Sequence, residues 1–139
     1  MYTVDVDGLE FFEQEGKRHT FPMHEGTGHA GSAVVVFELD PGVTLGSHTD
    51  SAEEILLVLQ GTAEATVGEE TGTLSAGQMA LVPASVPHNV RNTGSETLRV
   101  VGFFAASAIL SRFEEPLGPG APQVFVNGAP PEVPVLVAG

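Results

Sequence analysis

Residues 42–61 read GVTLGSHTDSAEEILLVLQG, with three candidate metal ligands placed directly before an apolar run. These ligands are His48, Asp50 and Glu54, and the apolar run is 55–59. In an extended strand, residues two apart point to the same side, so His48 and Asp50 would share one face. Imidazole and carboxylate groups aimed at one point suit a divalent metal.

A second stretch, residues 77–92, reads GQMALVPASVPHNVRN and adds His88. The two stretches together resemble the paired motifs of the cupin superfamily. The first runs Gly42, five residues, His48-Thr49-Asp50, three residues, Glu54, six residues, Gly61; the second runs Gly77, five residues, Pro83-Ala84-Ser85, two residues, His88, three residues, Asn92. The spacing matches at every step. Two identities differ, because Asp50 stands where the motif has a second His and Ser85 where it has Gly.

The resemblance implies an all-β fold, the cupin-type antiparallel β-barrel, also described as a double-stranded β-helix or jelly roll. The residue pattern indicates the same class, because short apolar runs alternate with Gly- or Pro-containing turns. We expect a barrel of six to eight strands with little helix. The strands are predicted at 32–39, 54–59, 62–67, 73–74, 79–82, 86–91 and 98–104. No long helical pattern links them, which argues against a parallel α/β sheet.

The chain of 139 residues is long enough for one domain with a hydrophobic core. We divide it into an N-terminal arm (1–31), a barrel core (32–105) and a C-terminal extension (106–139) that packs on the barrel or on a dimer partner. Segment 105–113, AASAILSRF, fits either helical turns or an irregular crossing. Further on, VFV at 124–126 and VPVLV at 133–137 are too apolar for a well-solvated tail.

The composition argues against several partners and reactions. The net charge is −13, with only five Lys and Arg, so phosphate backbones and anionic membranes should repel the chain. No cysteine is present, which removes disulfides, thiolate nucleophiles and Cys-based zinc sites. The first ten residues, MYTVDVDGLE, are acidic where a signal peptide would be basic and then apolar. We therefore expect a cytoplasmic protein without nucleic-acid or membrane partners.

The resemblance implies that His48, Asp50, Glu54 and His88 are the metal ligands, gathered near the barrel axis. Glu53 and Glu54 are neighbours in a strand, so only one can face inward, and the spacing favours Glu54. Cupins typically offer three His and one Glu. Two His and two carboxylates form a harder, more negative set that favours Fe or Mn, with Ni, Zn or Cu as further options.

Several functions remain open at this stage. The resemblance fits a small metalloenzyme, dioxygenase-like or isomerase/decarboxylase-like, acting on a small organic molecule. It also fits a metal-free module that binds a small ligand, and a structural, storage-type role has little support. His48, Asp50 and His88 further resemble the facial triad of Fe(II)/2-oxoglutarate oxygenases, in which Arg99 would hold the co-substrate carboxylate. The expected apolar pocket walls are Val34, Val36, Leu56, Val58, Met79, Leu81, and Phe103 or Phe104.

Three further histidines, His19, His24 and His29, lie in the turn-rich first part of the chain. They are interpreted as loop histidines, with the alternative that His24 or His29 lines the pocket mouth. The resemblance also implies a homodimer, and the apolar tail or N-terminal strands are the expected interface.

Overall fold

The computed structural model describes residues 1–127 and is almost entirely β-structure. Two short 3-10 turns, η1 (Val6–Gly8) and η2 (Glu25–Thr27), interrupt it. The strands are β1 (Phe12–Gln14), β2 (Lys17–Met23), β3 (Ala33–Leu39), β4 (His48–Asp50), β5 (Glu54–Gln60), β6 (Thr62–Val67), β7 (Glu70–Ser75), β8 (Met79–Val82), β9 (His88–Asn92), β10 (Leu98–Phe104), β11 (Ile109–Phe113) and β12 (Val124–Asn127).

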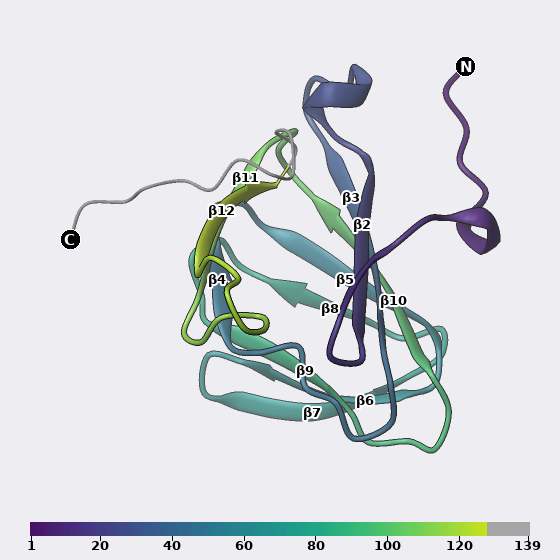
Figure 1. The fold of residues 1–139 in the computed structure, drawn as a ribbon, viewed down its shortest axis with the longest axis vertical. Coiled ribbons are helices and arrows are strands. Elements are labelled where there is room, and N and C mark those ends of the chain that lie inside the picture. Colours follow the sequence, from purple (N-terminus) through teal and green to yellow (C-terminus); the bar gives the residue numbers. More distant parts are fainter. Residues whose placement is uncertain (128–139) are drawn as a thin grey trace.

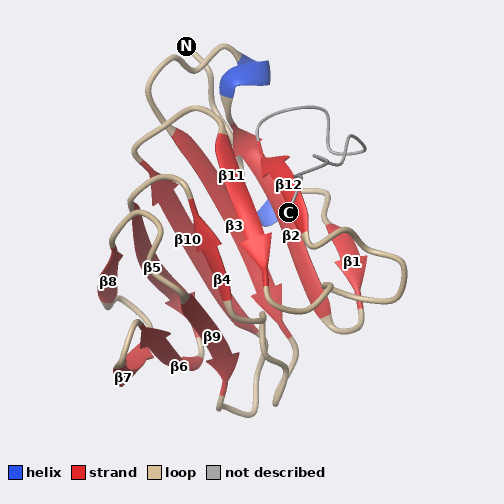
Figure 2. Cartoon of the chain, turned by 90° about the vertical axis from the view of Figure 1, so that its left-hand side faces the viewer, coloured by secondary structure: helices blue, strands red, loops and turns tan. Residues whose placement is uncertain are grey.

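These strands form two antiparallel sheets that face each other (Figures 1 and 2). The first sheet has the order β1-β2-β3-β10-β5-β8, and the second has the order β12-β11-β4-β9-β6-β7. The hydrophobic core lies between them, around fully buried side chains such as Leu39, Val58 and Leu98. Among the described residues, no helix has the length and apolarity to cross a membrane.

All seven predicted strands form, but the expected total of six to eight is too low. The first part of the chain adds β1 and β2, the metal-ligand segment adds β4, and the C-terminal part adds β11 and β12. Sequence reasoning missed β2 because KRHTFPM mixes charge, His and Pro22. The pairing of β2 with β3 shifts between Thr20 and Met23, around the proline that has no N–H to donate. Segment 105–113 contains no helix, because residues 105–108 form bends and Ile109–Phe113 is a strand that pairs with β4.

The C-terminal segment VFV at 124–126 lies within β12, which pairs with β11 along the sheet edge. The second apolar segment of the tail, 133–137, lies outside the described residues.

Two motif positions explain why the spacing is kept. Gly61 has a φ of +91°, and a Cβ there would lie 3.2 Å from the backbone of Leu98, so a side chain would clash as well as strain the turn. Asn92 is buried at 1% exposure, and its amide donates to the carbonyl oxygens of Leu39 and Glu96. Both residues therefore serve the fold rather than the chemistry.

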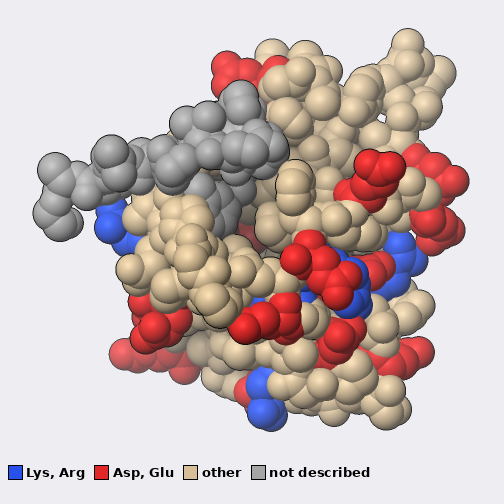
Figure 3. Space-filling view, in the orientation of Figure 1, with Lys and Arg blue, Asp and Glu red and all other residues tan. Residues whose placement is uncertain are grey.

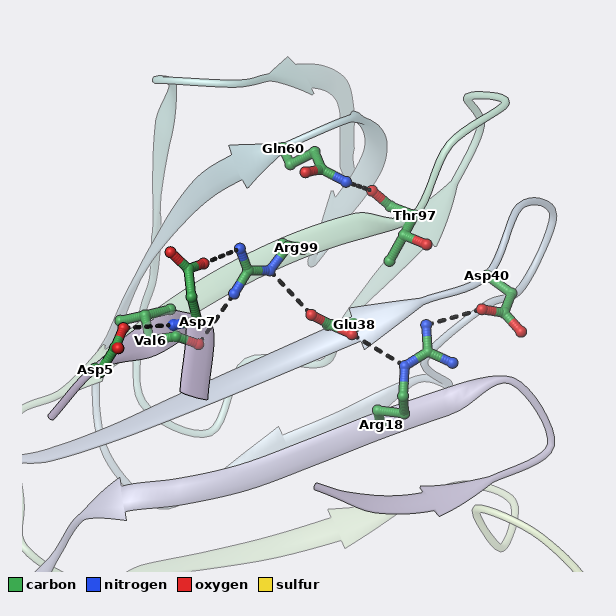
Figure 4. Close-up of polar contacts among 9 residues, drawn as sticks. All are labelled: Asp5, Val6, Asp7, Arg18, Glu38, Asp40, Gln60, Thr97 and Arg99. Atoms are coloured by element: carbon green, nitrogen blue, oxygen red, sulfur yellow. Dashed lines mark hydrogen bonds and ion pairs between the residues drawn. The ribbon is translucent and has the colours of Figure 1, made fainter. Parts of the chain in front are cut away.

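A chain of ion pairs crosses the outer face of the first sheet (Figure 4). Glu38 on β3 accepts from Arg18 on β2 at 3.0 Å and from Arg99 on β10 at 2.9 Å. Arg99 also contacts Asp7 of the N-terminal arm at 3.0 Å, and Arg18 contacts Asp40 at 2.8 Å. Arg99 therefore fastens the arm to the outside of the sheet.

Candidate metal centre

Three strands bring the four predicted ligands together. His48 and Asp50 come from β4, Glu54 from β5 and His88 from β9, with His48 directly opposite His88 in the β4–β9 pair. All four are buried, with exposed fractions of 7%, 5%, 4% and 3% respectively. The inward face of β5 is the predicted one, because Glu54 is buried and Glu53 is exposed.

The donor atoms of these residues converge. Asp50 Oδ2 lies 3.1 Å from His88 Nε2 and 3.5 Å from His48 Nε2. Glu54 Oε1 lies 3.5 Å from His88 Nε2. One ligand atom each from His48, Asp50 and His88 falls within 4.8 Å of the others. The three form the centre of the cluster, and Glu54 adjoins it through His88.

Backbone carbonyls fix which nitrogen of each ring faces the cluster. His48 Nδ1 donates to the Gly46 carbonyl at 2.8 Å, and His88 Nδ1 donates to the Val86 carbonyl at 2.9 Å. A carbonyl can only accept, so Nδ1 carries the proton in both rings. When the rings are neutral, each Nε2 then offers a lone pair toward Asp50, which is the arrangement typical of metal-binding histidines.

Two of the converging atoms lack a hydrogen bond. Asp50 Oδ1 accepts from Ser111 Oγ at 2.6 Å, but the fully buried Asp50 Oδ2 and His88 Nε2, 3.1 Å apart, have no hydrogen-bond partner among the described residues as long as the His88 ring is neutral. Unpartnered buried polar atoms are costly. Two lone pairs facing each other need a proton or a cation between them, so the donor set fits a divalent metal.

The pKa values of the cluster are shifted by burial and by the contacts among its charged groups. Burial favours a neutral His88, but contacts with Asp50 and Glu54 outweigh it and raise the pKa of His88 to about 10. Burial would also raise the pKa of Asp50, yet contacts with His48 and His88 hold that pKa well below its usual range. Burial raises the pKa of Glu54. In the absence of metal, a proton therefore stays on His88 against Asp50.

The cluster opens into a cavity of about 60 Å³ between the sheets. This volume accommodates a few water-sized groups. Its walls are mainly apolar and include Phe21, Val35, Phe37, Leu56, Phe104 and Phe113. Phe113 stacks on His48 with ring centroids 4.3 Å apart, so it also fixes the ring.

The predicted walls are only partly right. Leu56 and Phe104 line the cavity, and Val58 is buried in the core without lining it. The wrong ones are Val34, Val36, Met79, Leu81 and Phe103. On β3 and β10 the prediction chose the wrong face of the strand, because Val35, Phe37 and Phe104 point into the cavity and their neighbours point away from it. On β8, Met79 and Leu81 are 65% and 55% exposed.

His19, and neither His24 nor His29, lines the cavity. His24 instead caps η2, where its ring accepts from the Gly26 N–H, and His29 contacts Thr27. His19 was missed because β2 was missed.

Two small residues that sequence reasoning overlooked shape the cluster. Ser111 orients Asp50, and its position in ILSRF, between inward-facing Ile109 and Phe113, was the available signal. Gly102 leaves space for Glu54, because a Cβ at Gly102 would collide with Glu54 Oε2. A glycine inside the apolar strand LRVVGFF was the signal for such a close approach.

Arg99 does not belong to the cavity. It lies on the outer face of β10, 19% exposed and bound to Glu38 and Asp7 (Figure 4). Phe104 of the same strand lines the cavity. The expectation that Arg99 holds a co-substrate carboxylate is therefore wrong.

Comparison with known proteins agrees with this fold. A family model described as the cupin domain matches residues 35–104. An uncharacterised protein of Streptomyces coelicolor is 36% identical over 73 residues, which are 52% of this chain and 69% of that protein. The xanthan biosynthesis protein XanB of Xanthomonas campestris is 34% identical over 84 residues, which are 56% of this chain but 18% of XanB.

Solved structures share the architecture at lower identity. The oxalate decarboxylase of Lactobacillus farciminis in complex with formate has a TM-score of 0.72 at 20% identity, covering 78% of this chain and 34% of that one. The Cnp3 cupin domain of Schizosaccharomyces pombe has a TM-score of 0.66 at 19% identity, covering 75% of this chain and 73% of that one. At these identities the likeness shows the fold, a two-sheet antiparallel β-barrel.

Proposed function

This chain belongs to the cupin family, and from that premise we propose that it is a small metalloprotein. It binds one divalent transition metal through His48, Asp50, Glu54 and His88 and acts on a small organic molecule. The observation that carries the proposal is the convergence of Asp50 Oδ2 with the Nε2 atoms of His48 and His88, at 3.5 and 3.1 Å, inside a buried cluster.

The donor set favours Fe or Mn over softer metals, because two of its four donors are carboxylates. When bound, the metal supplies a Lewis acid for a carbonyl, enolate or carboxylate oxygen of the ligand. The apolar walls exclude water around that oxygen. Burial raises the pKa of Glu54, and Glu54 must lose its proton before it can bind the metal. This arrangement supports dioxygenase-like or isomerase/decarboxylase-like chemistry.

The test is element analysis of freshly purified protein that has never met a chelator, followed by turnover assays with the metal identified. We expect close to one transition-metal ion per chain, mainly Fe or Mn. If the protein is metal-free and stays so after incubation with Fe(II), Mn(II), Ni(II) or Zn(II), the metal proposal is refuted. A module that binds a small ligand without metal is then the better description of the function.

Metal affinity should keep rising with pH above about 7, where an ordinary histidine has already lost its proton. The raised pKa of His88, about 10, means that the ring is protonated throughout the neutral range and must lose that proton to bind metal. The neutral fraction, and so the affinity, grows about tenfold per pH unit from about 6.5 to 9. Titrations with Mn(II) at pH 6.5, 7.5 and 8.5 measure this slope, and affinity that levels off above pH 7 would contradict it.

We also propose that the chain forms a homodimer, through an apolar patch on the outer face of the first sheet in place of the tail or N-terminal strands expected from the sequence. Phe103, Ile55 and Leu81 lie side by side across β10, β5 and β8, with Met79 and Leu59 beside them. All five are exposed, from 39% to 65%. They leave on the order of 450 Å² uncovered, more than half of the ~800 Å² that each partner buries in a standard interface. A second copy presents the same uncharged surface.

Leu81→Glu should convert the dimer into a monomer, because the interface would bury two extra carboxylates. Light scattering at micromolar concentration measures the mass, with Leu110→Glu as the control at an exposed apolar residue on β11. A monomeric wild type, or a Leu81→Glu variant that stays dimeric, would contradict the patch as the interface.

A further inference from the structure

Every Lys and Arg of the chain lies within the described residues, and none lines the cavity. Arg18 and Arg99 bind Glu38 on the outer face, and Arg91 lies 4.0 Å from Glu64 at the surface. Arg112 is exposed, on the side of β11 opposite Ser111. Figure 3 shows how few basic side chains accompany the acidic ones on one face of the molecule.

Among these cations, Lys17 comes closest to the cavity. It shares the inward face of β2 with His19, and its Nζ donates to the carbonyl oxygen of Leu45 at 3.2 Å. Leu45 lines the cavity, but Lys17 does not. Its ammonium is therefore held at the backbone beyond the cavity wall.

The charge of the cluster leaves little room for an anionic ligand. Asp50 and Glu54, when ionised, balance a divalent metal, and the two histidines bind it as neutral rings. An aspartate at position 50, where the family motif has histidine, makes this sum one unit more negative. An uncompensated charge in a buried apolar cavity is costly. A dianionic ligand would bring two uncompensated charges into the cavity and a monoanionic ligand would bring one, whereas a neutral ligand would bring none.

His19 is the polar group in the cavity wall that the cluster does not use. The Nδ1 atoms of His48 and His88 are engaged by carbonyls, and Ser111 donates to Asp50. No described residue forms a hydrogen bond with the His19 ring, which contacts Phe12 at 5.9 Å between centroids. Burial lowers the pKa of His19, so near neutral pH the uncharged ring offers one donor and one acceptor.

We propose that the cavity selects a small ligand with an apolar body and at most one negative charge, with His19 as its uncharged hydrogen-bond partner. The inference rests on the proposed function, since the ligand binds beside the metal. It separates this chain from an enzyme whose substrate is oxalate, because oxalate is a dianion and the cavity wall supplies no cation for its second charge.

The test compares pyruvate and oxalate on Mn(II)-loaded protein. Both have six non-hydrogen atoms and two adjacent oxygens that can reach a metal, but pyruvate carries one charge and a methyl group. Water-proton relaxation of the bound Mn(II) measures both affinities without any turnover. In water, Mn(II) binds oxalate more tightly than pyruvate. We expect the ratio of the two affinities to be at least tenfold smaller for Mn(II) bound in the protein. An oxalate preference as large as in water would overturn the proposal.

Variants of His19 test its role separately. His19→Phe should weaken pyruvate binding about tenfold and His19→Gln much less, while Mn(II) content stays the same. His19→Arg should recover oxalate binding at least tenfold, because it adds the missing cation. Lys17→Met is the control and should leave both affinities unchanged. Pyruvate binding unaffected by His19→Phe, or oxalate binding that depends on Lys17, would overturn the proposal. Failure of the wild type to retain Mn(II) would instead refute the proposed function.

Discussion

Replacing His88 with alanine is expected to remove the metal, with a loss of at least about a hundredfold in affinity. His88 Nε2 lies within 3.5 Å of both carboxylates of the cluster, so its loss takes away the donor that joins Asp50 to Glu54. No other described imidazole can replace it, because His48 already belongs to the cluster and His19 lies outside the group of converging ligand atoms.

Element analysis of His88→Ala beside the wild type measures this loss. His29→Ala is the matched control, because His29 contacts Thr27 outside the cavity and should leave the metal in place. His88→Ala also leaves the Asp50 carboxylate buried without a cation, so circular dichroism must show that the variant is folded. His88→Gln, which fills the same space, is the alternative if it is not. Wild-type metal content in a folded variant would remove His88 from the ligand set.

Gly102→Ala adds a single methyl group and is expected to lower both the metal affinity and the free energy of unfolding. The new Cβ would collide with Glu54 Oε2 and lie 2.8 Å from Val35 Cγ1. Val35 and Gly102 are directly paired on β3 and β10, so neither can move away cheaply. Overpacking of this kind costs about 1–3 kcal/mol of unfolding free energy. Glu54 must also leave its place, which should lower metal affinity at least tenfold.

Chemical denaturation and Mn(II) titration measure the two effects. Gly72→Ala on β7 is the control, since a Cβ there meets nothing within 4 Å. Adding Glu54→Asp to Gly102→Ala shortens the displaced side chain and should restore part of the stability. A Gly102→Ala variant as stable as Gly72→Ala, with unchanged metal affinity, would show that Glu54 does not need this space.

The sequence was enough to predict the fold class, from short apolar runs between turns, and the four clustered residues, from the resemblance of its two motifs to those of cupins. Period-two alternation placed Glu54 and Leu56 inward, and the motif spacing added His88 from a distant strand. The structure brings these residues together as expected.

Features that depend on strand pairings outside the two motifs could not be predicted. Ser111 reaches Asp50 only because β11 pairs with β4, and His19 reaches the cavity only because β2 pairs with β3. The alternation in ILSRF could indicate that Ser111 faces inward, but not which strand it would face. The choice between Phe103 and Phe104 as the cavity residue was a matter of parity, and Pro22 concealed the strand that carries His19.

The strand order also bears on how the chain reaches its native state. β10 lies in the middle of the first sheet, between β3 and β5, although it is made after both. Val36 and Val101 are neighbours there, so the sheet cannot close until most of the chain has left the ribosome. Folding dominated by such distant pairings is slow, in the range of milliseconds to seconds. Until β10 is made, the edges of β3 and β5 that it will cover stay unpaired, so the sheet that carries Glu54 is completed late in synthesis.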